Sequence, residues 1–277
     1  MDAVPRQFTD EDSASVLSLI DGDLLPGRPS VTPAVLRLAL AGLFPGSRAA
    51  GLERPQTEVL TSHDGQVVGV VSHTTRGDGT GLLLWLHCLD DDERLAQVLL
   101  GHAQMRLGRR TTVHAFTEAT LLAPAGLAVR NRPGTRRALE AAGFSGTDRW
   151  RYLRHRLATL SPWLFAVVDL SERSDAPGWR LCLQERSGRP IGEVRTGPPI
   201  QGSVHIEGIT LADSRRFLGH VLLDQCLVNL ADRGIREVTT CLEAPSTDRP
   251  RSYAVRHLHE AVGFVEIDQL HTYIRRP

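Results

Sequence analysis

Apolar residues in the first half of the chain recur with a helical period at the start and then form strand-like runs. Two helices are predicted over SASVLSLI and TPAVLRLALAG, the second beginning with Thr32 as N-cap and Pro33 in its first turn. A Pro/Gly-rich turn, LLPGRPS, separates them. Continuous apolar runs predict three strands, with an Asp64-Gly65 hairpin turn before the second: TEVLTSH, GQVVGVVSHTT and GLLLWLHCL.

The remainder of this half alternates helix and strand patterns. An amphipathic helix is predicted over DDDERLAQVLLGHAQMRLG, a strand over TTVHAFTEA, a short helix over PGTRRALEAAGF and a last strand over WRYLRHRL. Strands that alternate with helices predict an α/β fold, in which some of the strands pair antiparallel.

The second half repeats the back of this pattern. EAAGF (Glu140 to Phe144) recurs as EAVGF (Glu260 to Phe264), VHAFTEA recurs as VTTCLEA, and Val-Leu-Leu at 98–100 recurs at 221–223. Three matches in the same order indicate two copies of one fold. Four strands are predicted before the repeated helix: WLFAVVDL, WRLCLQER, IGEVRTG and SVHIEGITL.

These patterns together predict an α/β (α+β mixed sheet) protein with two tandem domains. The first is expected over residues 1–158 and the second over residues 159–277, with the linker ATLSP between them. The second domain is predicted to be shortened at its N-terminus, because no counterpart of the two leading helices precedes its strands.

Composition excludes several classes of function. The 277 residues hold 32 basic and 32 acidic side chains, so no basic excess favours a nucleic-acid partner. The chain has no lysine, which excludes Schiff-base chemistry and phosphate-binding lysines. The longest apolar run, at 82–89, is too short to span a membrane, and we expect the polar N-terminal segment not to act as a signal peptide. With four widely spaced cysteines, we expect a cytoplasmic protein without a membrane partner.

The order strand, amphipathic helix, strand, short helix ending in Gly-Phe, strand resembles the GNAT N-acetyltransferase superfamily, which includes tandem-domain proteins. The resemblance covers nearly the whole chain and is stronger in the second copy. It implies acetyl-CoA as co-substrate, with the pyrophosphate held by a glycine-containing loop at a helix N-terminus. Such a terminus attracts anions because its amides are unpaired and its dipole end is positive.

The second copy matches the family loop in part. Gly219 stands at the last glycine position, Phe217 replaces the earlier glycine, and Arg215 and Arg216 supply cations for the phosphates. The alternative is an ordinary helix start with two solvated arginines. The resemblance implies a cofactor-binding set made of the end of the preceding strand and the loop: Ile209, Leu211, Arg215, Arg216, Phe217, Leu218, Gly219 and His220.

The first copy carries the opposite charge at this place. Asp92 and Glu93 align with the two arginines, Ala96 aligns with Gly219, and Asp90 and Asp91 add further negative charge. Each unit charge close to a phosphate costs about 1 to 4 kcal/mol, more than the helix dipole returns. We therefore expect acetyl-CoA to bind the second copy and not the first.

Acetyl transfer to an amine needs a base and an acid. The strand SVHIEGITL places His205 and Glu207 on one face, and family members often carry a glutamate here, so Glu207 is the first choice of base and His205 the second. His259 stands where members of the family often have a tyrosine that serves as the general acid, and Tyr253 is the alternative proton donor. An exposed strand face and a packed histidine remain the structural alternatives. No metal site is expected, since His257 and His259 are two residues apart and diverge on a helix.

Two functions follow from this resemblance. The first is an acetyl-CoA-dependent N-acyltransferase, active in the second copy, that moves an acetyl group by direct transfer to the amine of a small molecule or peptide. The first copy would then complete the acceptor pocket, and a homodimer is possible. The alternative is a non-catalytic acyl-CoA-binding or regulatory pseudo-acetyltransferase.

Overall fold

The computed structural model describes residues 4–44, 52–108, 111–157, 167–174, 177–184, 190–211, 218–244 and 250–277. These residues form two compact units, and each unit contains segments of both sequence repeats. Unit 1 comprises Met1–Leu25, Ser30–Arg149 and Asp268–Pro277, and unit 2 comprises Pro26–Pro29 and Trp150–Ile267. The predicted domain boundary at residues 158 and 159 lies outside the described residues and stays a prediction.

Unit 1 contains a sheet with the order β1-β2-β3-β4-β5-β13. All neighbours pair antiparallel except β4 and β5, which are parallel. The strands are β1 (Val4–Gln7), β2 (Gln56–Thr61), β3 (Val67–Thr75), β4 (Gly81–Cys88), β5 (Val113–Ala115) and β13 (Val265–Arg275), with the short β6 (Leu127–Ala128) also paired to β13. The α-helices are α1 (Ser13–Gly22), α2 (Pro33–Leu40), α3 (Glu93–Leu107) and α4 (Pro133–Ala141).

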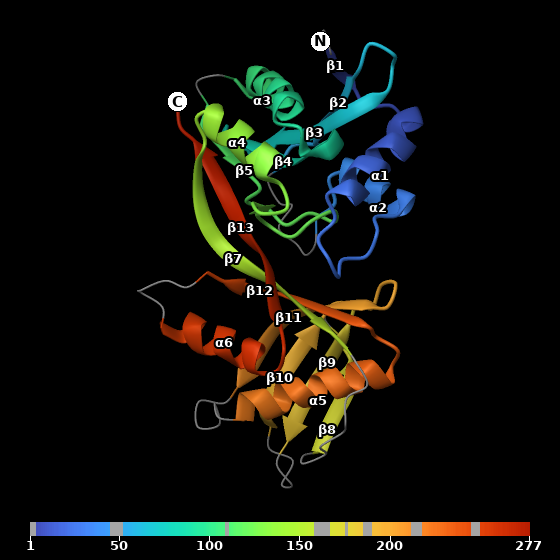
Figure 1. Cartoon of the computed structure of the whole chain (residues 1–277), viewed down its shortest axis with the longest axis vertical. Helices are drawn as coiled ribbons and strands as arrows, with labels where there is room; N and C mark the ends of the chain where they lie inside the picture. Colours follow the sequence, from blue (N-terminus) through green and yellow to red (C-terminus); the bar gives the residue numbers. More distant parts are fainter. Residues whose placement is uncertain are drawn as a thin grey trace. The chain divides into compact units, whose positions relative to one another are not determined.

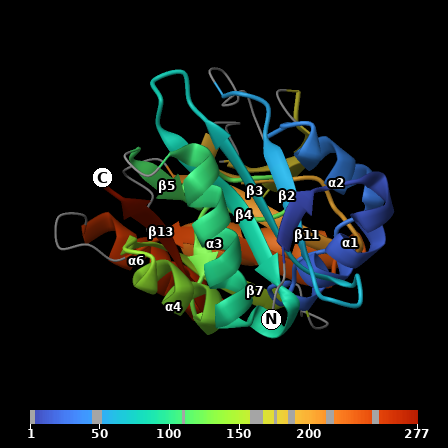
Figure 2. The same cartoon turned by 90° about the horizontal axis from the view of Figure 1, so that it is seen from above.

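Helices cover both faces of this sheet. Figures 1 and 2 show α1 and α2 on one side of β2 to β4 and α3 and α4 on the other. Neighbouring residues of one strand therefore enter different cores: Val70 packs with the α1 and α2 residues, and Val71 packs with the α3 and α4 residues. Burial on both faces explains why β3 and β4 read as continuous apolar runs.

Unit 2 contains a sheet with the order β7-β12-β11-β10-β9-β8, in which only β11 and β12 are parallel. The strands are β7 (Ser145–Arg156), β8 (Val167–Glu172), β9 (Trp179–Gln184), β10 (Pro190–Thr196), β11 (Ser203–Leu211) and β12 (Glu237–Glu243). Two helices follow β11 and β12: α5 (Gly219–Asp232) and α6 (Pro250–Ala261). The described residues between β8 and β11 form no helix, in agreement with the predicted shortening.

The core of unit 2 lies on one face of its sheet. Val204 and Ile206 of β11 pack with Leu222 and Cys226 of α5 in a single apolar cluster. His205 and Glu207 point to the other face. The register between β11 and β10 shifts between Arg195 and Thr196, which interrupts the alternation of side chains, so Ile209 and Leu211 return to the core face.

The last strand of each repeat pairs with strands of the other repeat. β13 ends the second repeat and pairs antiparallel with β5, while β7 ends the first repeat and pairs antiparallel with β12. In both units a parallel pair is thus followed by an antiparallel strand, as two copies of one fold require. The exchange explains why unit 1 includes Asp268–Pro277 from the end of the chain, whereas unit 2 is discontinuous because it includes Pro26–Pro29.

Several local predictions are confirmed. The Thr32 hydroxyl accepts a hydrogen bond from the Val35 amide at the start of α2, and Pro33 occupies the first turn. The strand predicted over TTVHAFTEA is shorter than expected, because Phe116 adopts a φ of 58° directly after β5 and ends the extended conformation. Among the described helices, none is both long and apolar enough to cross a membrane.

Candidate functional site

The parallel strands β11 and β12 separate part of the way along their length. Their register pairs Ser203–Ile206 with Glu237–Thr240, and β11 then continues to Leu211 without pairing to β12 in the described residues. On its other side β11 stays paired with β10 as far as Leu211. Among the described residues, the backbone groups of β11 beyond Ile206 thus have no β12 partner on this side, and an extended ligand can pair with them.

The amino end of α5 follows the carboxyl end of β11. Leu218 is the N-cap residue, it makes no side-chain cap hydrogen bond, and the first turn of α5 holds no acidic residue. The first amides of a helix lack partners within the helix and carry the positive end of its dipole. This terminus can therefore bind an anionic group.

The equivalent terminus in unit 1 is occupied by a protein side chain. One carboxylate oxygen of Asp92 accepts hydrogen bonds from the amides of Arg94, at 2.8 Å, and Leu95, at 3.0 Å. The first turn of α3 also holds Glu93. The amides that could bind a phosphate are thus used by a carboxylate, which would also repel one.

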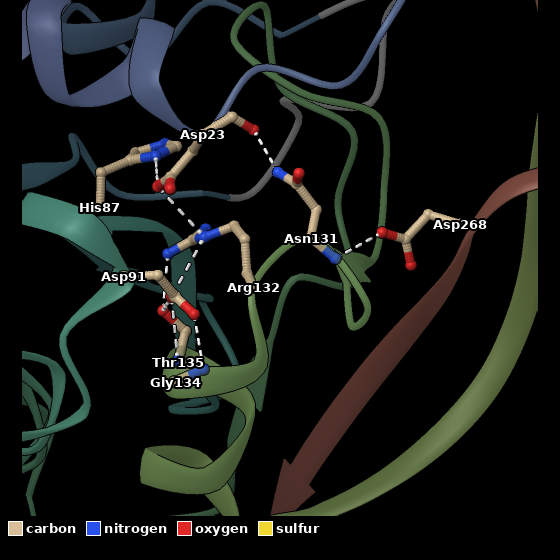
Figure 3. A network of polar contacts seen from close by, with 8 residues as sticks. All are labelled: Asp23, His87, Asp91, Asn131, Arg132, Gly134, Thr135 and Asp268. Atoms are coloured by element: carbon tan, nitrogen blue, oxygen red, sulfur yellow. Dashed lines mark hydrogen bonds and ion pairs between the residues drawn. The ribbon is translucent and has the colours of Figure 1, made fainter.

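Unit 1 contains a second capped helix, and the cap belongs to a buried polar network (Figure 3). Asp91 accepts from the amides of Gly134 and Thr135 at the start of α4, at 2.5 and 3.0 Å. The Arg132 guanidinium lies between Asp91 and Asp23, with Nε 3.7 and 3.1 Å from their carboxylates. In unit 1, therefore, Asp91 accepts hydrogen bonds from backbone amides of the same unit, and Asp91 and Asp23 form ion pairs with Arg132.

Gly219 allows three elements of unit 2 to approach one another. A Cβ at this position would lie 2.9 Å from a methyl of Leu211 on β11 and 3.1 Å from a methyl of Leu258 on α6. Close packing accounts for this glycine independently of any ligand. Ile209 and Leu211 are both partly buried against the unit 2 core.

The rest of the predicted loop can be placed only in part. Arg215, Arg216 and Phe217 lie outside the described residues, while Leu218 packs on the core and His220 is exposed in the first turn of α5. The predicted cofactor-binding role of these residues stays a prediction.

His205 and Glu207 lie on the face of β11 opposite the core. His205 Nδ1 is 3.0 Å from the Thr239 hydroxyl on β12. The Glu207 carboxylate is half-exposed and forms an ion pair with Arg173, whose side chain is 6% exposed. Any cation that binds this carboxylate would compete with the Arg173 guanidinium.

Burial, with a smaller contribution from the positive charge of Arg28, lowers the pKa of His205 from 6.5 to about 4. The imidazole is therefore neutral at pH 7, and it is a weak proton acceptor toward an ammonium group. The role of either residue as the base stays a prediction.

Acidification is expected to weaken unit 2 through His205. The unfolded imidazole binds a proton below pH 6.5 and the folded one only near pH 4, so its contribution to stability is lost as the pH falls through this range. Urea unfolding of His205→Gln between pH 7 and 4 should show a shallower decline than the original protein. His63→Gln is the control, because that side chain is 93% exposed. Equal slopes for all three proteins would contradict the assignment.

The side chain of one of the two predicted proton donors, His259, is described by the structure, and that of the other, Tyr253, is not. His259 is 1% exposed, its Nδ1 is 2.7 Å from the Val255 carbonyl oxygen, and its ring packs edge-on against Phe264. Its buried Nε2 has no hydrogen-bond partner among the described residues. Burial lowers the pKa of His259, so the ring is neutral at pH 7. Tyr253 lies on α6, and its side chain is outside the described residues.

Sequence reasoning missed two contributors to this face of unit 2. Arg173 pairs with Glu207 although 34 residues separate them, and no local pattern marks the pair. The segment Pro26–Pro29 was interpreted only as a turn, yet it belongs to unit 2. The proline and glycine content of this segment predicted a turn, but it could not predict which sheet the turn packs against. The described residues contain no group of three or more His, Cys, Asp or Glu side chains placed to bind a metal ion.

Comparisons with known proteins concern the fold. No family model matches the sequence, and no curated protein matches it. Among solved structures, a GCN5-related N-acetyltransferase from Sphaerobacter thermophilus is 15% identical, with a TM-score of 0.64 over 99% of this chain and 96% of that chain. A tandem GNAT protein from the clavulanic acid biosynthesis pathway is 15% identical, with a TM-score of 0.64 over 99% of this chain and 97% of that chain.

A third solved structure is similar in fold although its sequence identity is lower. An acetyltransferase of the GNAT family from Colwellia psychrerythraea is 10% identical, with a TM-score of 0.57 over 99% of this chain and all of that chain. These three matches cover nearly the whole of this chain. The chain has the GNAT acetyltransferase fold, with the mixed α/β architecture of tandem GNAT proteins.

Proposed function

We propose that the protein is an acetyl-CoA-dependent N-acyltransferase whose active site lies in unit 2. The observation that carries the proposal is the difference between two equivalent helix termini. The first amides of α3 are occupied by Asp92, whereas in the described residues α5 begins without a side-chain cap and without an acidic residue in its first turn. A diphosphate is repelled at the first terminus and attracted at the second.

The residues present fit acetyl-CoA at this place. The unpaired backbone edge of β11 beyond Ile206 can bind the amides of an extended pantetheine arm, and the α5 terminus can bind the diphosphate. Gly219 keeps the helix start close to the end of β11, since a side chain there would contact Leu211. The orphaned Nε2 of His259 is a buried polar atom that a ligand or an inserted water could satisfy.

When bound, acetyl-CoA supplies an activated thioester. The acceptor nitrogen attacks its carbonyl carbon, the C–N bond forms as the C–S bond breaks, one amine proton goes to a base, and the thiolate takes up a proton to leave as the thiol. Glu207 is the base that we assign, because it is half-exposed and lies opposite the packed core. His205 is held neutral and orients the neighbouring Thr239 hydroxyl.

Turnover measurements test this assignment. Titration with acetyl-CoA should show binding, and a panel of small amines and peptides should release CoA thiol. Glu207→Gln should lower kcat at least tenfold and leave the affinity for acetyl-CoA unchanged, because the amide keeps the shape and loses the proton acceptor. Glu193→Gln is the matched control, since that carboxylate also pairs with an arginine, Arg180, on the unit 2 sheet. No binding of acetyl-CoA would overturn the proposal.

The second candidate is an acyl-CoA-binding or regulatory protein without transferase activity. Two observations favour it: Glu207 is already paired with Arg173, and His259 is packed against Phe264 away from solvent. Binding of acetyl-CoA without thiol release on any amine would select this function.

A further inference from the structure

The turn Pro26–Pro29 is fixed to the sheet of unit 2 through its backbone. The Tyr152 hydroxyl on β7 donates to the Pro26 carbonyl oxygen at 3.0 Å, and the Ser203 hydroxyl on β11 donates to the Gly27 carbonyl oxygen. Tyr152 is fully buried. Two prolines further restrict the turn, so its conformation is largely set before any ligand binds.

Gly27 brings the turn into direct contact with the face of the sheet that carries His205. Its φ of +87° is in the left-handed region, and a Cβ there would lie 2.9 Å from the Thr239 Cγ2 atom. The hydroxyl of the same Thr239 is 3.0 Å from His205 Nδ1. The turn therefore lies beside His205, on the face of β11 that points away from the core.

Arg28 is the charged side chain of this turn. It is half-buried, and burial lowers the pKa of its guanidinium. Its positive charge also acts on His205. Because Arg28 directly follows Gly27, which lies against Thr239, this residue lies in the part of the turn beside His205, on the face of β11 that also bears Glu207.

We propose that Arg28 is a specificity-determining residue of the unit 2 acceptor site, where its guanidinium binds a carboxylate of the acceptor amine. This inference rests on the proposed function. A guanidinium matches a carboxylate in a bidentate geometry, and the interaction strengthens as the cation loses water. The neutral His205 does not compete for the anion.

The spacing along β11 describes the acceptor further. Successive same-face residues of a strand are about 7 Å apart, so a carboxylate near His205 and an amine near Glu207 are separated by several bonds. The acceptor class is therefore an amino acid or peptide whose amine and carboxylate are not on the same carbon.

The test compares acceptors that differ only in charge. We would measure acetyl transfer to β-alanine and 4-aminobutanoate and to the neutral amide of each. Arg28→Gln should raise KM for the two acids at least tenfold and change KM for the amides less than twofold. The affinity for acetyl-CoA should stay unchanged, and Arg28→Lys should recover part of the loss. The backbone anchors are carbonyl oxygens of Pro26 and Gly27, so neither variant removes them.

Arg180→Gln is the matched control. That arginine is half-exposed, lies on β9 of the same sheet and pairs with Glu193. It should leave both classes of acceptor unaffected. An equal rise in KM for acids and amides in Arg28→Gln, or a loss of acetyl-CoA affinity instead, would overturn the inference.

A binding measurement separates failure of this inference from failure of the proposed function. If no amine is acetylated, the proposed function fails, and calorimetric titration with 4-aminobutanoate still tests Arg28. Binding to the original protein that is lost in Arg28→Gln supports the inference. Equal binding to both proteins, or binding to neither, contradicts it.

Discussion

Replacement of Asp268 by alanine is expected to lower the free energy of unfolding by roughly 3 to 5 kcal/mol, as for other losses of a buried charged hydrogen-bond network. The carboxylate is 1% exposed and accepts hydrogen bonds from the amides of Arg130, Asn131 and Gln269 at 3.0, 2.7 and 2.6 Å. Without it, these donors lose their acceptor in a place with little access to water, at about 1 to 3 kcal/mol each before relaxation. Urea unfolding followed by circular dichroism measures the loss.

The effect should extend beyond the contact itself. Asn131 donates its side-chain amide to the Asp23 carbonyl oxygen, and the next residue, Arg132, lies between Asp23 and Asp91 (Figure 3). Asp268 belongs to β13, the strand that unit 1 receives from the second repeat. Its loss should therefore weaken the attachment of the exchanged strand as well as the network.

The repeat supplies a matched control. Asp148 is the counterpart of Asp268 in the first repeat, and it is 35% exposed and 3.8 Å from the His271 imidazole. Asp148→Ala should cost less than about 1 kcal/mol, as expected of an exposed ionic contact. Asp268→Asn, which keeps one acceptor oxygen, should fall between the two. Similar losses for the two alanine variants would show that the buried carboxylate does not hold β13.

Charge reversal in the loop before α5 should abolish the affinity for acetyl-CoA. In Arg215→Glu/Arg216→Glu, two attractions to the diphosphate become two repulsions, and four unit-charge changes of at least about 1 kcal/mol each correspond to roughly a thousandfold weaker binding. The variant would give the second copy the charge that Asp92 and Glu93 give the first. Calorimetric titration with acetyl-CoA at fixed ionic strength measures the change.

The control carries the same charge change at the other end of the same helix. Arg233 and Arg236 are exposed residues between the carboxyl end of α5 and the start of β12, and Arg233→Glu/Arg236→Glu should alter the affinity less than threefold. Unchanged binding in the loop variant would remove the cofactor assignment. Equal losses in both double variants would indicate a long-range effect of net charge in place of a phosphate contact.

Sequence patterns predicted the local structure of this chain with few exceptions. Helix starts at Thr32 and before Glu93 were predictable, because caps and apolar periodicity are properties of a few consecutive residues. The repeated EAAGF and EAVGF motifs predicted two copies of one topology for the same reason. The acidic residues at the start of α3 were also predictable, and the structure shows that the Asp92 carboxylate accepts hydrogen bonds from the first amides of this helix.

The environment of the candidate acid and base was not predictable from the sequence. The sequence leaves His259 as either a proton donor or a packed side chain, and only the structure shows it buried against Phe264. Glu207 could be placed on a strand face, but its pairing with Arg173 depends on how the chain between them folds. Burial and ion pairs are set by distant residues, so they leave no local signal.

The sequence by itself determined the type and order of the elements, the repeat and the opposite charges at the two helix termini, since each is encoded within a short stretch of chain. Only the tertiary structure decided that β13 completes the sheet of unit 1, that β7 completes the sheet of unit 2, and that the turn carrying Arg28 belongs to unit 2. β7 and β13 have similar sequence patterns, so either strand could form the backbone hydrogen bonds at a given sheet edge. The choice between them therefore depends on long-range contacts such as those of Asp268 with Arg130 and Asn131.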